Sequence, residues 1–488
     1  MPISEDTFFL DTRFKGTLQS QIQQMVAEGI LSGQFKPGDR LPSSRRLAAH
    51  LGVARITVTL AYTELLADDY LRSEGRSGYF VSENAPQPSH FPAPPPSTDS
   101  VDWTRTLTGR DPVAALHRKP AQWRDYRYPF IYGQADHRLF DHKNWRACAL
   151  RALGTRELDA LTNDYDDRDD DQLVEYIARH ILPRRGIQAG PEEVLITLGA
   201  QNGLWLAAQV LLTQRRTAAI EAPCYPGLRD ILHQTRCQLE PVTVDAQGLP
   251  PEGLPETTDV AFVTPSHQCP TNATMPLHRR KELLKAANEQ DFLIVEDDYE
   301  FELSFLGAPH PALKSLDTEG RVIYAGSFSK SLFPGLRLGF LVGAKPFIAE
   351  ARALRATVLR HPPGLMQRTT AHFLRLGHYA AQIRRMRRAY AARRETMLTA
   401  LKTHGLMVEG QGDFGGSSVW MRAPEGIDSA ALAKRLAPRS VLIEPGHGFF
   451  ADTAPCPFYR LAYSSIPSEL IPKGIEILAQ TIAEMQSA

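Results

Sequence analysis

Lys330 and Asp297 are the residues whose types and surroundings point most directly to chemistry. Lys330 stands between Ser329 and Ser331 on a loop, and a lysine amine in such a place can form an imine with an aldehyde. Asp297 directly follows an apolar segment, and a carboxylate beneath a pyridine ring keeps the ring nitrogen protonated, so that the ring draws electrons from the imine. Tyr299 could hydrogen-bond a phenolic oxygen. These residues predict a site for pyridoxal phosphate.

The phosphate of this cofactor needs hydrogen-bond donors and positive charge. Ser327, Ser329 and Arg337 cluster around the lysine in the sequence and suit this purpose. Ala200 and Gln201 follow a predicted strand and open a helix, whose N-terminal amides favour an anion. Tyr225 follows a further strand, where its ring could stack on the pyridine. Each signal alone is weak, because a lysine between serines is usually a solvated surface residue.

The elements that would position these residues predict an α/β fold with a mainly parallel sheet. Apolar segments alternate with helical ones, and the predicted strands cover residues 194–198, 218–221, 260–264, 292–295 and 322–325. Ligands bind at the carboxyl ends of such strands. Asp297 and residues 327–330 each lie just beyond a predicted strand, so we expect them to share one site.

Length and composition set wider bounds. The chain has 488 residues and a formal net charge of zero, which indicates two or three domains and requires any nucleic-acid contact to come from a local patch. Its five cysteines are scattered, so we expect neither a metal site nor a disulfide framework. The N-terminus lacks a secretion pattern, and no apolar run is long enough for a membrane span. We therefore expect a cytoplasmic protein.

Prolines are dense between Ser82 and about Ser100, a composition that blocks helices and favours extended polyproline II. We expect a linker over residues 82–124, between an N-terminal domain of residues 1–81 and a C-terminal domain of residues 125–488 with a smaller subdomain from about residue 360. Such a linker is long enough for the N-terminal domain to reach a neighbouring subunit.

The N-terminal domain has the pattern of three helices followed by a hairpin. Apolar residues recur at three- and four-residue spacing between Gly16 and Leu31, and a second helix is predicted from Arg45 to Leu51. The third helix has an inward stripe of Val58, Ala61, Tyr62 and Leu65, which leaves Arg55, Ile56, Thr57 and Thr59 at outward or flanking positions. Residues 71–81 read as two short strands around a glycine-containing turn.

This domain resembles the GntR-type winged helix-turn-helix. The resemblance rests on residues 41–55, with Leu-Pro-Ser-Ser-Arg-Arg-Leu-Ala near their start, and on the hairpin Gly-Arg-Ser-Gly at 75–78. It implies that double-stranded operator DNA is the partner, with base or phosphate contacts from Ser43, Arg45, Arg46, Arg55, Thr57, Thr59, Gly75 and Arg76. The alternative is a small helical dimerisation module with solvated arginines.

Residues 125–488 resemble aminotransferases of fold type I. The amino-acid sequences of segments 264–268, 296–299 and 329–339 are similar to those of the MocR branch of bacterial regulators. The resemblance implies a homodimer, head-to-tail and domain-swapped. It also implies that Arg460 grips a ligand's carboxylate, or a sulfonate, unless Arg460 is a surface arginine beside a strand. Cys269 stands where many aminotransferases have asparagine, and Asn272 where they have glycine, which puts full transamination in doubt.

Two charged runs can be interpreted either as structural features or as binding sites. The acidic run 164–171 precedes a predicted helix that begins near Gln172, and we prefer a favourable interaction with the helix dipole to a metal site. Six arginines (Arg384, Arg385, Arg387, Arg388, Arg393 and Arg394) lie on a probable long helix after Gly377. We expect a solvated face there rather than a surface that touches DNA beside the operator.

The leading hypothesis is a transcriptional regulator that senses an amino compound. The compound would displace Lys330 from pyridoxal phosphate by imine exchange and be held by Arg460, and the dimer would then alter how two winged domains meet DNA. One alternative is a working aminotransferase with an accessory DNA-binding domain. Another is a repressor whose cofactor pocket is structural or senses the free vitamin form.

Overall fold

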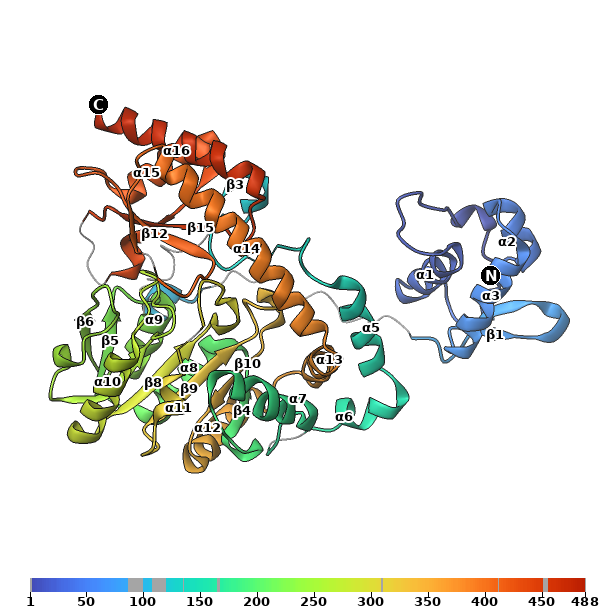
Figure 1. The fold of residues 1–488 in the computed structure, drawn as a ribbon. Helices are drawn as coiled ribbons and strands as arrows, with labels where there is room; N and C mark the ends of the chain where they lie inside the picture. The colour runs from blue at the N-terminus through green and yellow to red at the C-terminus, as the bar shows by residue number, and fades with distance from the viewer. Residues whose placement is uncertain are drawn as a thin grey trace. The chain divides into compact units, whose positions relative to one another are not determined.

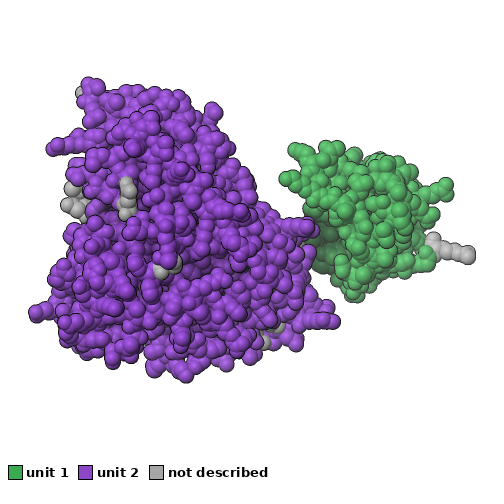
Figure 2. All heavy atoms as spheres, in the orientation of Figure 1, with its two compact units in different colours: residues 1–109 green, residues 110–488 purple. Residues whose placement is uncertain are grey.

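A computed structural model describes residues 2–86, 100–107, 120–134, 136–164, 167–308, 310–410, 412–450 and 455–487, apart from the side chains of Arg76, Thr104 and Ala160. The chain divides into two compact units, residues 1–109 and 110–488 (Figure 2). Much of the predicted linker lies outside the described residues, and α4 (Trp103–Thr106) is a short helix within its described part. Within the described ranges, no helix is long and apolar enough to cross a membrane.

Within residues 2–86 of the first unit, three α-helices are followed by a two-stranded hairpin (Figure 1). The helices are α1 (Leu18–Leu31), α2 (Ser44–Leu51) and α3 (Arg55–Ala67), and the hairpin pairs β1 (Leu71–Ser73) with β2 (Tyr79–Val81). Ser43 caps α2 by accepting a hydrogen bond from the Arg46 amide, and Gly52 ends the helix with a φ of 66°. The predicted helices and wing are confirmed.

The core of the first unit has the inward stripe that the sequence predicted, since Val58, Ala61, Tyr62 and Leu65 are all buried. The residues before α1 also pack into this core. Phe8 is buried, and its ring centroid lies 5.6 Å from that of Phe35. This N-terminal segment carries no periodic pattern, and the sequence did not indicate its role.

A seven-stranded sheet is the centre of the second unit (Figure 1). In sheet order the strands are β4 (Val194–Thr197), β10 (Gly339–Val342), β9 (Val322–Ser327), β8 (Leu293–Asp298), β7 (Thr258–Val263), β5 (Thr217–Ala222) and β6 (Gln238–Thr243). The pairings from β9 to β6 are parallel, and β10 runs antiparallel to both of its neighbours. The mainly parallel sheet is confirmed; β6 and β10 were not predicted.

Alternate residues of the strands face two apolar layers. Ile220 and Phe262 belong to one layer, and Ala219 and Ile294 to the other. The first layer is completed by α8 (Gly199–Leu211), α9 (Pro226–Thr235) and α12 (Lys345–Leu359). The second layer is completed by α10 (Leu277–Gln290) and α11 (Leu313–Leu316). Helices therefore cover both faces of the sheet.

A smaller sheet lies in the C-terminal part of the chain. Its order is β11 (Val408–Gly410), β12 (Ser418–Arg422), β15 (Phe458–Ala462) and β14 (Glu444–Pro445), and all its pairings are antiparallel. The helices of this region are α14 (His378–Thr403), α15 (Ser429–Leu436) and α16 (Ile471–Gln486). The short strand β3 (Tyr128–Pro129) pairs with β13 (Val441–Leu442), which brings the residues after β3 beside β14.

The two charged runs have more specific roles than we expected. Asp170 caps α7 (Asp171–Tyr176) by accepting from the Leu173 amide, as the helix-dipole interpretation requires. Asp169, however, is a buried ion-pair partner of Arg352 and Arg355. Three further helices of the second unit are α5 (His142–Ala152), α6 (Leu158–Thr162) and α13 (Gly364–Arg375). Within the described ranges, no cluster of acidic, histidine and cysteine side chains could hold a metal ion.

The predicted solvated face of the arginine-rich helix α14 is only partly right. Arg384 and Arg388 are exposed. Arg393 is buried, pairs with Asp136 and donates to the Ser464 carbonyl at 2.6 Å. Arg387 donates from Nε to the Glu302 carbonyl at 2.6 Å. A single run of arginines thus divides between solvent and the interior, because α14 packs on one side and is open on the other.

Candidate functional site

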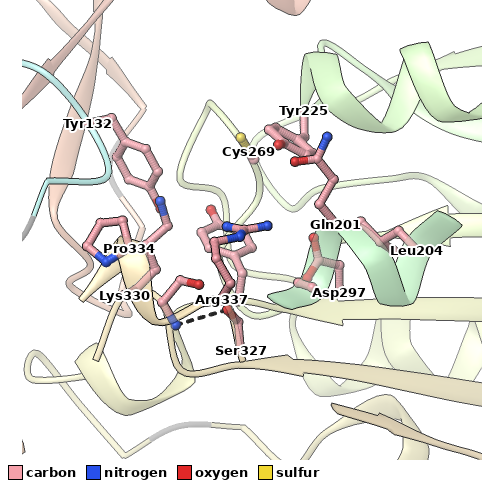
Figure 3. A pocket seen from close by; sticks show the side chains of 13 residues that line it. Tyr132, Gln201, Leu204, Tyr225, Cys269, Asp297, Ser327, Lys330, Pro334 and Arg337 are labelled. Atoms are coloured by element: carbon pink, nitrogen blue, oxygen red, sulfur yellow. Dashed lines mark hydrogen bonds between the residues drawn. The ribbon is translucent and has the colours of Figure 1, made fainter. Parts of the chain in front are cut away.

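One cavity, at the carboxyl ends of β8 and β9, collects every residue that the sequence proposed for the cofactor. Its volume is about 150 Å³. The described residues that line it are Tyr132, Ala200, Gln201, Leu204, Tyr225, Cys269, Asp297, Tyr299, Ser327, Ser329, Lys330, Pro334 and Arg337 (Figure 3). The expectation that two strand ends share a site agrees with this geometry.

Lys330 lies in the turn just after β9 and extends its amine toward Tyr132 (Figure 3). The pKa of this amine is lowered to about 8, mainly by burial; Glu300 opposes this shift, and Arg460 contributes to it. Gly133 passes close to the amine with a φ of 76°, and a Cβ atom at Gly133 would stand 2.7 Å from Nζ. The amine is thus confined, and a substantial fraction is uncharged near neutral pH.

Asp297 is the penultimate residue of β8, not the first residue beyond the strand as the sequence suggested. Its side chain is buried, and its Oδ1 has no hydrogen-bond partner. The pKa of Asp297 is raised to about 7, mainly by burial; the charges of Asp298 and Glu221 contribute to this shift, and Lys330 opposes it. A buried carboxylate oxygen without a donor is costly, and the protonated nitrogen of a pyridine ring is a donor that fits it.

The other end of the cavity has groups that suit a phosphate. The Ser329 amide donates to Ser327 Oγ at 3.2 Å, and the buried Ser329 Oγ has no partner of its own. The helix α8 begins at Gly199 without a side-chain cap, and Ala200 and Gln201 of its first turn line the cavity, where uncapped amides favour an anion. Arg337 Nη2 donates to the Leu198 carbonyl at 3.2 Å, which holds the guanidinium at this helix end.

Tyr225 and Tyr299 bring two aromatic rings to the cavity, from the segments after β5 and β8. Tyr299 donates its hydroxyl to the His267 carbonyl at 2.8 Å. Burial raises the pKa of Tyr225 to about 12 and of the Cys269 thiol to about 12, so these groups are neutral near pH 7. Cys269 lies beside the rings (Figure 3), where a thiol is a weaker hydrogen-bond donor than an asparagine amide.

The turn that carries Cys269 also explains Asn272. Asn272 has a φ of 64°, so it adopts the left-handed conformation that we expected an asparagine to tolerate. Its side-chain amide donates to the Ser418 carbonyl at 3.1 Å. A glycine could take the same backbone conformation, but only the asparagine ties this turn to the smaller sheet.

Arg460 is buried on β15, which excludes the surface-arginine interpretation. Its Nε donates to Glu444 at 2.9 Å, and its Cζ lies 3.9 Å from the Tyr132 ring centroid and 4.8 Å from that of Phe449. Arg460 does not line the cavity as the described residues define it. The predicted acid-binding arginine therefore lies beside the cavity, in contact with two of its lining residues, Tyr132 and Cys269.

Sequence reasoning missed several residues around Lys330. Tyr132 lines the cavity, and its hydroxyl donates to the buried Glu300 at 2.7 Å. Glu300 also accepts from the Ser417 hydroxyl at 2.7 Å and lies 3.5 Å from His267 Nε2. Glu300 is next to Tyr299, a signal that was available. Tyr132 comes from a distant segment, and no local pattern marks it.

The first unit places most of the proposed DNA contacts on one exposed part of its helices. Arg45 and Arg55 are exposed, and Thr57 and Thr59 are partly exposed. Arg46 pairs with Glu5 at 2.6 Å, so part of its charge is already neutralised. The Ser43 oxygen accepts in the cap of α2 and keeps its proton for a phosphate. Gly75 is exposed in the wing, and the side chain of Arg76 lies outside the described residues.

Comparison with known proteins identifies both units. Residues 18–81 match the model of the bacterial regulatory proteins of the gntR family, and residues 138–478 match aminotransferase class I and II. The HTH-type transcriptional regulator TauR of Rhodobacter capsulatus is 58% identical, over 99% of this chain and 100% of that protein. The probable rhizopine catabolism regulatory protein MocR of Rhizobium meliloti is 30% identical, over 96% of this chain and 95% of that protein.

The chain belongs to the MocR-type transcriptional regulators. Its first unit is a GntR-type DNA-binding domain, and its second has the fold type I architecture. Among solved structures, Pyrococcus horikoshii kynurenine aminotransferase superposes with a TM-score of 0.71 at 28% identity, over 79% of this chain and 99% of that one. A MocR-type regulator thus carries an enzyme fold as its second part.

Proposed function

We propose that this regulator binds pyridoxal phosphate at Lys330 and uses it to detect an amino compound. The observation that carries the proposal is one cavity whose lining includes a lysine amine of lowered pKa, an aspartate with an unpartnered buried oxygen, and serine and arginine side chains that can donate to a phosphate. When bound, the cofactor supplies an aldehyde that condenses with primary amines. The chain's own residues decide how it is held and which amine gains access.

In this proposal each side of the cavity has one task. Asp297 accepts a hydrogen bond from the ring nitrogen and holds the proton there. Ser327, Ser329, Arg337 and the first amides of α8, at Ala200 and Gln201, bind the phosphate. Tyr225 stacks on the ring, and Tyr299 orients its phenolic oxygen.

The effector would be a small amine that also carries an acidic group. Arg460 is the cation that suits this group, because a guanidinium binds a carboxylate or sulfonate through two parallel hydrogen bonds. Replacement of Lys330 by the effector amine frees the lysine and shifts the balance between two conformations of the regulator. In a domain-swapped homodimer, this shift changes how two GntR-type domains meet the two half-sites of an operator.

A working aminotransferase is the second candidate, and one observation favours it: Lys330, Asp297 and Tyr299 all line one cavity. Cys269 argues against it, since its thiol has a raised pKa and is a weak donor. Incubation of the loaded protein with amino donors separates the two. Steady formation of keto acid supports the enzyme, and a single spectral change without turnover supports the sensor.

The proposal is tested by the visible absorption of the cofactor-loaded protein. Lys330→Ala should abolish the band of the lysine-bound cofactor, whereas Lys345→Ala should keep it, because Lys345 is exposed and pairs with Glu192 on the surface. A band that persists in Lys330→Ala would remove Lys330 from its role. Operator binding that responds to pyridoxal phosphate but to no amine would favour the vitamin-sensor alternative.

A further inference from the structure

The Tyr132 ring lies against both cations that the proposed ligand needs. Lys330 Nζ is 4.0 Å from the ring centroid, and Arg460 Cζ is 3.9 Å from the same centroid. The two cations are therefore no farther apart than these two distances together. Tyr132 lines the cavity, and Arg460 does not. The ring thus covers one face of the guanidinium, whose Nη1 also lies 3.8 Å from Sγ of the cavity residue Cys269.

Hydrogen bonds hold Tyr132 in this position at both its ends. Its hydroxyl donates to Glu300 Oε1 at 2.7 Å, and its backbone amide donates to Glu444 Oε2 at 3.1 Å. Glu444 Oε2 also accepts from Arg460 Nε at 2.9 Å. The Glu444 carboxylate therefore binds both Tyr132 and the arginine that the Tyr132 ring covers.

The hydroxyl of Tyr132 can leave Glu300 without depriving Oε1 of its other hydrogen-bond donor. Glu300 is buried, and its Oε1 also accepts from the Ser417 hydroxyl at 2.7 Å. When Tyr132 leaves, Oε1 keeps the hydrogen bond from the Ser417 hydroxyl, and His267 Nε2 lies 3.5 Å from Oε2. The cost of opening is then close to that of one hydrogen bond to a charged group, which corresponds to about 10- to 100-fold in affinity.

We propose that Tyr132 is a specificity-determining gate over Arg460, closed by its hydrogen bond to Glu300 and opened by ligands that carry an acidic group. The inference rests on the proposed function and adds which ligands are admitted. A carboxylate or sulfonate exchanges the ring contact of Arg460 for two charge-assisted hydrogen bonds, which are stronger than a cation–π contact. An amine without an acidic group has nothing to exchange, so it leaves the gate closed.

The gate makes a prediction about affinity for matched ligands. β-Alanine and ethylamine share a primary amine, and only β-alanine has an acidic group. Tyr132→Phe keeps the ring but removes the bond to Glu300, so it should lower the Kd of β-alanine by about 10- to 100-fold and leave that of ethylamine unchanged. Titrations of the cofactor-loaded protein followed by visible absorption give both constants. Tyr176→Phe is the matched control, because Tyr176 is a partly buried ring that packs on His180.

A second measurement tests the cover without the cofactor. Phenylglyoxal modifies accessible arginines, and mass spectrometry of peptides reports the extent at each site. In the full-length protein without cofactor, Tyr132→Ala should raise the modification rate of Arg460 at least about tenfold, since it removes the ring that Arg460 contacts. Arg388, which is exposed on α14, should react equally in all variants.

The outcomes separate the gate from the proposed function. Equal modification of Arg460 in the wild type and Tyr132→Ala, or equal shifts of both Kd values in Tyr132→Phe, would overturn the gate. If Arg460 becomes reactive in Tyr132→Ala while no amine changes the spectrum of any variant, the gate stands as a cover of Arg460 and the sensing proposal fails.

Discussion

The lowered pKa of Lys330 predicts how fast the protein captures pyridoxal phosphate at different pH values. Only the uncharged amine attacks an aldehyde. With a pKa of about 8, roughly one amine in ten is uncharged at pH 7, whereas a lysine at its ordinary value of 10.5 would have only about one in three thousand. The fold should therefore accelerate capture at pH 7 by about 300-fold over an unperturbed lysine of equal access.

The direction of the pH dependence follows from the same shift. Below pH 8 the uncharged fraction grows about tenfold per pH unit, and above pH 8 it levels off. Stopped-flow mixing of cofactor-free protein with pyridoxal phosphate from pH 6 to 10 measures this profile, with N-acetyl-lysine as the unshifted reference. Because Asp297 titrates at about 7, the profile should also be taken for Asp297→Asn, in which the inflection near pH 8 should remain.

A rate that keeps rising to pH 10 in parallel with the reference would refute the reasoning. It would mean that the Lys330 amine is solvated in the free protein, and that burial in the cavity does not oppose its charge. A rate independent of pH between 6 and 8 would equally contradict it, since another step would then limit capture.

Three further predictions concern single residues. Asp297→Asn should weaken pyridoxal phosphate binding by about 3–5 kcal/mol, the cost of losing one partner of a buried charge pair, as measured by equilibrium dialysis; an unchanged affinity would exclude Asp297 from the ring nitrogen. Arg55→Ala should weaken specific DNA binding by about 1–3 kcal/mol in footprinting, with Arg388→Ala as an inert control, and an unaltered footprint would refute base reading by α3. Ser43→Ala should lower the free energy of unfolding of the first unit by about 1 kcal/mol, because α2 loses its cap, whereas Ser43→Asn should restore it in thermal melts.

The residues that the sequence proposed for the cofactor line one cavity, for a physical reason. Parallel strands end at one edge of the sheet, so residues that follow different strands meet there whatever their separation along the chain. Lys330, Asp297 and Tyr225 could be placed by this rule alone. The buried strands β5, β7, β8 and β9 were equally visible, because strands covered on both faces are continuously apolar.

The remainder depends on contacts that no local pattern records. β6 lies at the sheet edge and is largely polar, so it lacks an apolar signature. Tyr132 reaches the cavity because β3 pairs with β13, more than three hundred residues later in the chain. Arg393 was placed with its solvated neighbours because its partner Asp136 lies 257 residues earlier in the chain. Pairings of this kind are set by tertiary packing, not by spacing in the sequence.

The central claim is that an amine is detected at Lys330 and reported as a change in DNA occupancy. It is tested most directly with a genomic fragment that the protein itself selects, by measuring the fluorescence anisotropy of the labelled fragment against cofactor-loaded protein with and without a panel of short amino acids. We predict that at least one amino acid changes the DNA affinity of the wild type and leaves that of Lys330→Ala unchanged. An equal response of both proteins, or a wild type that converts the amino acids to keto acids without any change in DNA affinity, would contradict the account.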